Sequence, residues 1–483
     1  MDLPSSSAGA SGVHYVRLNV ASRLSTSSSG LIEHVRRFDR YWPIFAAAIA
    51  VFMVVSGQAI HGFVEHDDYV FLLAPGETGD APWRKTLSEG RWINWLWSLV
   101  SPNLTPALAS ILFILLFSIV CWLAVEVVTK HRASVLAALT LLFSPMLATL
   151  SLWPTTLVPS VMLMTVGIAL FSRNHSFSFD LATLAVCTYL EVFAYAPMAM
   201  VLVVVFAAKY GTAAWKRLLV AALTVAASYA LAILTIFILN LFAHGYFGVH
   251  IDSWRHPRSP HSLADLHANI ERYLMLWPQL WRDMPIPLLA SAVAFQIALL
   301  WRETRRVSIV LALATAFVVS IDIATSLSTG VFVPPRTVLW LWFAMCVPAI
   351  MLLNQRNALL VTIGAAALVL NLASGMSRWW HVYTDSALPV VRAEEQLAYD
   401  IQGALALAGG SSVVLYGNPK ADPRFRRGFF FDENALRWAL LKRFGLRVEM
   451  CEPEFCHRIE QAAPQTTIFS LEGRVVVFFP RQT

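Results

Sequence analysis

The sequence predicts a polytopic α-helical membrane protein with a small C-terminal α/β domain. Of its 483 residues, 57% are hydrophobic and only 14% are charged, whereas a soluble globular chain carries about 25% charged residues. Apolar stretches long enough to cross a bilayer recur through residues 41–375, and only residues 376–483 form a long stretch with the composition of a soluble domain. This pattern excludes a soluble enzyme, a disordered protein and a nucleic-acid-binding protein.

Residues 1–40 predict a cytoplasmic tail. They are rich in serine, contain several arginines and have no apolar core. The apolar stretch of a cleaved signal peptide would lie closer to the start, so we expect the first span to be uncleaved.

Eleven apolar stretches give the expected number of spans. We place them near residues 41–61, 104–127, 133–150, 157–172, 178–193, 196–210, 218–242, 286–301, 307–326, 337–353 and 358–374. Residues 176–210 fit either one tilted helix or two short ones, because Glu191 and Pro197 lie in the middle. Two helices leave more of the lysines and arginines in the cytoplasmic loops, as the positive-inside rule requires.

With eleven spans and a cytoplasmic N-terminus, the C-terminal domain lies outside. Two large loops, 62–103 and 243–285, and a short segment near 327–336 face the same side. In the second loop, apolar residues recur at helical spacing over 262–281, which predicts an amphipathic helix on the outer leaflet.

The C-terminal domain, 376–483, is expected to be α/β. Strand-like runs occur at 412–416, 447–451 and 475–480, and a helical pattern occurs at 433–444. Cys451 and Cys456 can form a disulfide if the domain faces an oxidising compartment, whereas a zinc site lacks a fourth ligand.

The first outside loop carries the residues best suited to chemistry. It contains Glu65-His66-Asp67-Asp68-Tyr69 and later Gly90-Arg91-Trp92. Two adjacent carboxylates at the membrane surface can take a proton from a hydroxyl or hold a divalent cation, and tryptophans can stack on a sugar or lipid. The alternative is a solvated acidic loop beside an aromatic belt.

Three further residues lie within spans or at their outer ends. Arg336 opens a span from the outside, against the positive-inside trend, and a lipid phosphate would explain its place; the alternative is snorkelling to the headgroups. Glu191 is a carboxylate inside a span, and Tyr195 follows one turn later, so the two could shape a pocket that opens outward.

These motifs resemble those of the bacterial O-antigen glucosyltransferases, which convert serotype and belong to the GT-C superfamily of membrane glycosyltransferases. The resemblance rests on Asp67-Asp68 after the first span, Gly90-Arg91 before the second, Pro335-Arg336 opening a late span, and the C-terminal domain. Leu190-Glu191 departs from the Tyr-Gln pair of that family.

The resemblance implies a GT-C-like fold and an inverting transfer of a hexose, commonly glucose, at the periplasmic face of the bacterial inner membrane. The donor would be a polyprenyl-phosphate sugar and the acceptor an envelope glycan such as O-antigen. Asp67 or Asp68 would deprotonate the acceptor, with or without a divalent cation held by the same pair. Arg336 and Arg91 would stabilise the leaving phosphate. The expected substrate contacts also include His66, Trp92, Glu191 and Tyr195.

Two other functions fit the same sequence. One is a non-catalytic transporter or flippase of a lipid-linked saccharide, and the other is a polysaccharide polymerase or ligase of the envelope. A transporter has no chemical need for an acidic pair in the first outside loop.

Overall fold

The computed structural model describes residues 42–129, 134–408, 412–425, 433–462 and 467–479. The tail expected over 1–40 lies outside these residues. The chain forms two compact units, Met1–Val51 and Phe52–Thr483. A short apolar helix covers Trp42–Val55, and the functional elements described below all belong to the second unit.

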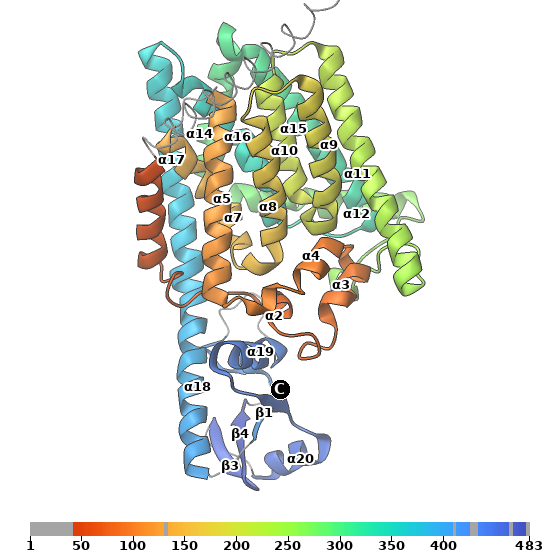
Figure 1. The fold of residues 1–483 in the computed structure, drawn as a ribbon, viewed down its shortest axis with the longest axis vertical. Coiled ribbons are helices and arrows are strands. Elements are labelled where there is room, and N and C mark those ends of the chain that lie inside the picture. The colour runs from red at the N-terminus through yellow and green to blue at the C-terminus, as the bar shows by residue number, and fades with distance from the viewer. Residues whose placement is uncertain (1–41, 130–133, 409–411, 426–432, 463–466, 480–483) are drawn as a thin grey trace, which may run out of the picture. The chain divides into compact units, whose positions relative to one another are not determined.

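Seven helical segments are long and apolar enough to cross a membrane, in the part of the chain that is described (Figure 1). They are α5 (Pro106–Thr129), α8 (Pro154–Phe171), α9 (Phe177–Tyr195), α11 (Trp215–His244), α15 (Arg302–Thr329), η3 with α16 (Pro335–Leu353), and a long segment, Ala358–Ala408. An eighth span results if α12 and α13 (Leu263–Asp283) count together with α14 (Pro285–Leu300), to which they are bent by 95°. The membrane-protein class is therefore supported, but the expected count of about eleven spans is not confirmed.

The missing spans are apolar stretches that fold into shorter helices. The stretch near 133–150 divides into α6 (Val135–Leu142) and α7 (Pro145–Leu150), because Ser144 caps a new helix and accepts hydrogen bonds from two of its amides. The region 176–210 forms two helices, α9 and α10 (Pro197–Tyr210), with Pro197 at the start of the second. The two-helix interpretation is thus confirmed, although α10 is short for a span.

α8 and α10 form the centre of the helical bundle. α5 and α9 pack along α8, α11 packs on α9, and α15 and α16 pack on α10. Almost every side chain of α10 is buried, whereas only 17% of the apolar stretch of α11 and 22% of that of α15 is buried, as expected for helices with one face toward lipid.

The second outside loop forms α12 (Leu263–Leu274) and α13 (Leu276–Asp283), where one amphipathic helix was expected. Leu263, Leu274 and Trp281 are exposed, while Asn269 and Tyr273 on α12 are buried. The exposed apolar residues fit an interfacial helix, as predicted for this segment.

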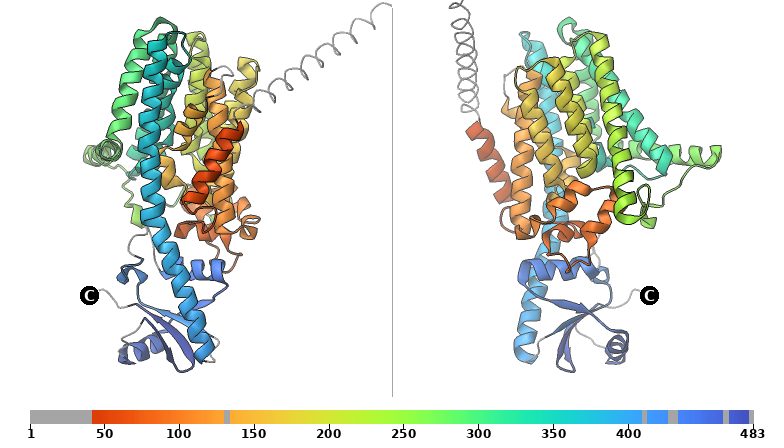
Figure 2. Two further views of the ribbon diagram at one scale, coloured as in Figure 1. Left: turned by 90° about the vertical axis from the view of Figure 1, so that its left-hand side faces the viewer. Right: turned by 45° about the vertical axis from the view of Figure 1, so that its right-hand side comes forward.

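The last apolar helix continues beyond the bundle as one long helical rod. α17 (Ala358–Trp380) passes through a π-helical turn, His381–Ala387 (η4), into α18 (Leu388–Ala408), which leads to the C-terminal domain (Figure 2). The hydrogen-bond spacing therefore widens locally from four residues to five where the chain leaves the bundle.

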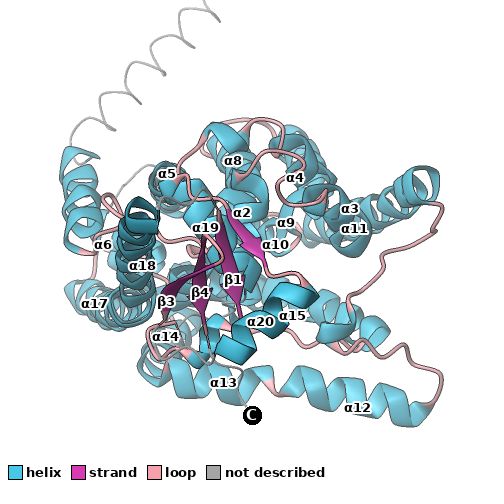
Figure 3. Cartoon of the chain, turned by 90° about the horizontal axis from the view of Figure 1, so that it is seen from below, coloured by secondary structure: helices cyan, strands magenta, loops and turns pink. Residues whose placement is uncertain are grey.

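The C-terminal domain is an α/β domain, as predicted. Its sheet has the order β2-β1-β4-β3, with β1 parallel to β2 and β4 and a β3–β4 hairpin at one edge (Figure 3). The strands are β1 (Val413–Tyr416), β2 (Val448–Met450), β3 (Ile468–Leu471) and β4 (Arg474–Phe478), and the helices are α19 (Glu433–Phe444) and α20 (Pro453–Ala462). Cys451 and Cys456 form a disulfide between β2 and α20.

Candidate active site

The two adjacent aspartates of α2 (His66–Leu72) lie in opposite environments. The Asp68 carboxylate is fully buried and accepts hydrogen bonds from the Thr155 amide at 2.8 Å, and from the Thr156 amide and hydroxyl, each at 2.6 Å. The first amides of a helix have no acceptor within it, so Asp68 completes the N-terminus of α8. Asp68 therefore anchors α2 to the bundle.

Burial has the largest effect on the pKa of Asp68. It raises the pKa of the carboxyl to about 6, although the hydrogen bonds from Thr155 and Thr156 act in the opposite direction. An enclosed carboxylate with three donors cannot reach a substrate hydroxyl. Of the two aspartates, Asp68 is therefore the poorer candidate for the general base.

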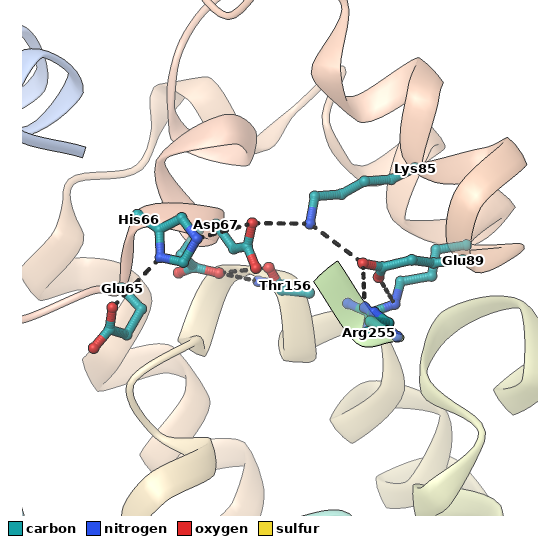
Figure 4. Close-up of polar contacts among 9 residues, drawn as sticks. Glu65, His66, Asp67, Lys85, Glu89, Thr156 and Arg255 are labelled. Carbon is teal, nitrogen blue, oxygen red and sulfur yellow. Dashed lines mark hydrogen bonds and ion pairs between the residues drawn. The ribbon is translucent and has the colours of Figure 1, made fainter. Parts of the chain in front are cut away.

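Asp67 is the accessible partner, with 41% of its side chain exposed. Its Oδ1 lies 3.3 Å from Lys85 Nζ and 3.5 Å from His66 Nε2 (Figure 4). Burial favours the neutral acid, but the charges of Lys85 and His66 outweigh it and hold the pKa of Asp67 below its usual value. Asp67 is therefore ionised and accessible to solvent, as a proton acceptor must be.

Lys85 extends this contact into a chain of alternating charges. Its Nζ lies 3.7 Å from Glu89 Oε1, and Glu89 in turn binds Arg91 Nε at 2.7 Å and an Arg255 amino group at 2.8 Å (Figure 4). Burial would raise the pKa of Glu89, but the surrounding cations lower it to about 2. Glu89 thus fixes two arginines from different outside loops in one place.

Gly90 explains why the Gly-Arg motif takes this form. It ends α3 (Ala81–Glu89) in the left-handed conformation at φ 70°, and a Cβ atom there would lie 2.9 Å from the Ile236 side chain. Only glycine fits both constraints. The resulting turn folds Arg91 back onto Glu89.

A second cationic group lies at the same end of α8. The Arg336 guanidinium is 5.0 Å from the centre of the Trp153 ring, and Trp153 is the residue immediately before α8. Arg91 lies 5.4 Å from the ring centre of Tyr195, whose hydroxyl interacts electrostatically with both Arg91 and Arg336. No carboxylate among the described residues forms an ion pair with Arg336, which leaves its guanidinium available to an anion.

Trp92 and His66 have partners within the protein. Trp92 Nε1 donates to Asn240 Oδ1 at 3.1 Å, and its ring packs edge-on against Trp83 at 5.5 Å. His66 lies between Asp67 and Glu65, whose carboxylate is 3.6 Å from His66 Nδ1. Trp92 therefore ties the first outside loop to α11, and His66 supports the charge of Asp67.

Glu191 is not brought to this group. It is fully buried in α9 and accepts a short hydrogen bond from the Ser160 hydroxyl of α8. Tyr195, one turn later, does reach the arginines. Glu191 and Tyr195 were expected to shape one pocket together. Of the two, Tyr195 contacts the charged cluster and Glu191 does not.

The acidic pair does not fit a shared metal ion. Asp68 points to the α8 amides, and Asp67 faces the Lys85 ammonium, so their carboxylates do not converge. Among the residues that the structure describes, no three His, Cys, Asp or Glu side chains come close enough together to hold a metal.

The second outside loop covers one side of the charged cluster. The His250 amide donates to the Leu87 carbonyl at 3.0 Å, close to the Arg255–Glu89 contact. Residues of this loop line a pocket of about 770 Å³ that is open to solvent. Its lining includes His250, His256 and Arg272, groups that can donate hydrogen bonds to a polar ligand.

Three members of the cluster were missed in the sequence: Lys85, Glu89 and Arg255. Lys85 and Glu89 are four residues apart on one helix face, a spacing that marks them as a pair. Arg255 carries no such local signal, because its contact with Glu89 joins residues 166 positions apart.

Neither a protein-family model, nor a curated protein, nor a solved structure matches the chain.

Proposed function

We propose that the protein is a membrane glycosyltransferase that moves a hexose, commonly glucose, from a polyprenyl-phosphate carrier to an envelope glycan such as O-antigen. The observation that supports this most strongly is the convergence at the outer end of α8. There neighbouring segments hold an accessible, ionised Asp67 and an Arg336 that forms no ion pair with any carboxylate of the described residues.

Each group has a role in the proposed transfer. Asp67 takes the proton of the acceptor hydroxyl, and the oxygen attacks C1 of the donor sugar from the face opposite the phosphate, which inverts the anomeric configuration. The bond between C1 and the phosphate oxygen breaks, and its electron pair leaves with the lipid phosphate. Arg336 and Arg91 stabilise the negative charge that develops there.

Lys85 acts on the group that binds the acceptor, and Glu89 acts on the arginines near the donor phosphate. Lys85 keeps Asp67 ionised before the acceptor arrives, and Glu89 neutralises part of the charge of Arg91 and Arg255. Arg336 forms no such ion pair with a described carboxylate and is the first choice for the donor phosphate. The reaction would take place on the periplasmic side of the bacterial inner membrane.

The test is transfer of radiolabelled glucose from polyprenyl phosphate to glycan in membranes containing the wild type or Asp67→Asn. Asp80→Asn is the matched control, because Asp80 is an exposed acid of the same loop with φ 57°, a conformation that asparagine tolerates. We expect transfer with the wild type and with Asp80→Asn, and its loss with Asp67→Asn.

Reconstituted vesicles separate this proposal from its alternatives. A flippase would move the lipid-linked sugar across the bilayer without forming a glycosidic bond. A polymerase or ligase would add a whole glycan chain, which product size reveals. Either result, or full activity of Asp67→Asn, would contradict the proposed mechanism.

A further inference from the structure

The C-terminal domain packs directly on the helix that carries Asp67. Tyr69 and Leu72 of α2, with Leu73 directly after it, form a buried apolar cluster with Ala439 of α19. At 100° per residue, these three side chains lie on the side of α2 away from Asp67. α19 therefore supports α2 from behind its reactive face.

Charged contacts fasten α19 in this position. Arg443, in its last turn, binds Glu394 Oε2 at 2.5 Å and Glu395 Oε1 at 3.0 Å. Both carboxylates belong to α18, the outward extension of the last span. His61 Nδ1 lies 3.0 Å from the same Glu395 oxygen, which links the end of the first apolar segment to this group. The next residue, Lys442, donates to the Pro102 carbonyl at 2.6 Å.

The ion pair also lies close to α2. Glu394 is almost fully buried, and Glu394 and Arg443 shift the pKa of the buried Tyr69 hydroxyl in opposite directions. A helix of seven residues is too short to be stable alone, so the orientation of α2 depends on its neighbours. Asp68 holds it to α8, and α19 packs on an adjacent face.

We propose that Arg443 is a positioning residue, through which the C-terminal domain braces α2 and so sets the direction of Asp67. The effect of this brace on transfer rests on the proposed function, whereas the brace itself does not. In this view the domain is part of the catalytic scaffold, and it acts without touching the reacting atoms.

Amide hydrogen exchange of the full-length protein in phosphatidylethanolamine–phosphatidylglycerol nanodiscs tests the brace directly. In Arg443→Gln we expect the amides of α2 to exchange about tenfold faster, because their local opening becomes easier. Arg443→Lys should fall between this variant and the wild type, since a lysine cannot bridge both carboxylates as the guanidinium does.

Arg437→Gln is the matched control on the same helix. Its guanidinium donates to the Val448 carbonyl inside the C-terminal domain and not to α18. We expect exchange in α2 to be unchanged in this variant. Unchanged exchange in Arg443→Gln, or equally faster exchange in Arg437→Gln, would overturn the proposal.

Lys442→Met keeps the proposal testable if Arg443→Gln does not fold. It removes the contact with Pro102 without leaving a buried carboxylate unpaired, and it should raise exchange in α2 by a smaller factor. If neither Lys442→Met nor Arg443→Lys alters exchange, α19 does not brace α2.

Transfer kinetics give a second readout. A displaced Asp67 should lower kcat by up to about 100-fold while KM changes little, since a shift of about 1 Å in a reacting group can cost that much. If the wild type transfers no sugar, the proposed function fails while the exchange result still decides the brace. A changed KM with an unchanged kcat would instead place Arg443 in substrate binding and contradict the positioning role.

Discussion

The outer end of α8 and its middle each bind a carboxylate, and they do so by different means. At the end, Asp68 receives two backbone amides and a hydroxyl because the first amides of a helix are not used within it. In the middle, Glu191 receives the Ser160 hydroxyl alone among the residues described, since the amides around it are already bonded within the helix.

The difference shows where this protein can keep a reactive charge. At the outer end, the anchored Asp68 leaves its neighbour Asp67 exposed and paired with the Lys85 ammonium. In the middle, the carboxyl group is sealed between α8 and α9 with no cation paired to it among the described residues. Chemistry at an ionised group is therefore expected at the outer end alone.

Asp67→Asn should give the largest effect. Asparagine keeps the size of the side chain but cannot accept a proton at neutral pH, so we expect transfer to fall about 10²- to 10⁴-fold. Thermal stability should change little, because the side chain is half-exposed. The rate of transfer from polyprenyl-phosphate glucose measures the effect. An equal loss of transfer in Asp80→Asn would show that any substitution in this loop disrupts its structure.

Arg336→Met comes next and tests the cationic part of the outer end. Without the guanidinium, the charge on the leaving phosphate loses a donor, and we expect kcat to fall about 10²- to 10³-fold. Arg336→Lys should retain part of the rate, because the charge remains but the bidentate geometry is lost. Equal rates for both variants and the wild type would remove Arg336 from the site.

Asp68→Asn should affect stability more than chemistry. The folded-state pKa of about 6 lies above the ordinary value for aspartate, so the fold binds this proton more tightly than the unfolded chain does. The stabilisation from that proton is complete at low pH and is lost as the pH rises through about 6, by about 3 kcal/mol in total.

The melting temperatures of the wild type and Asp68→Asn between pH 4 and pH 8 measure this contribution. Asparagine resembles the protonated acid and does not titrate. The wild type should therefore lose stability relative to Asp68→Asn as the pH rises. A difference that is constant with pH would mean that Asp68 does not titrate in this range.

The sequence carried enough information to find the acidic pair, Arg91 and Arg336, but not to separate Asp67 from Asp68. Their different roles depend on Thr155 and Thr156, which lie nearly 90 positions away. No local pattern encodes such a contact. The same holds for Arg255, whereas Lys85 and Glu89 were available as a helical pair.

The fold shows the same division between local and distant information. Hydropathy located the apolar stretches, and alternation located three strands of the C-terminal domain. Hydropathy did not show where a helix is interrupted, so the stretch with Ser144-Pro145 was counted as a span although the chain there forms two short helices. The packing of α19 on α2 could not be predicted from the sequence, because Ala439 and Leu72 are distant in sequence.

Glu191→Gln should give the smallest effect and is the sharpest test of the comparison. Glutamine keeps an oxygen that accepts the Ser160 hydrogen bond and has nearly the same volume, so stability should change by less than about 1 kcal/mol. Because the side chain is sealed from the outer site, transfer should stay within about twofold of the wild type, the ordinary result away from reacting groups. Glu191→Ala is the contrasting variant, since it leaves Ser160 without a partner and opens a cavity, and it should lower the melting temperature. A large loss of transfer in Glu191→Gln at unchanged stability would show that the middle of α8 takes part in the reaction after all.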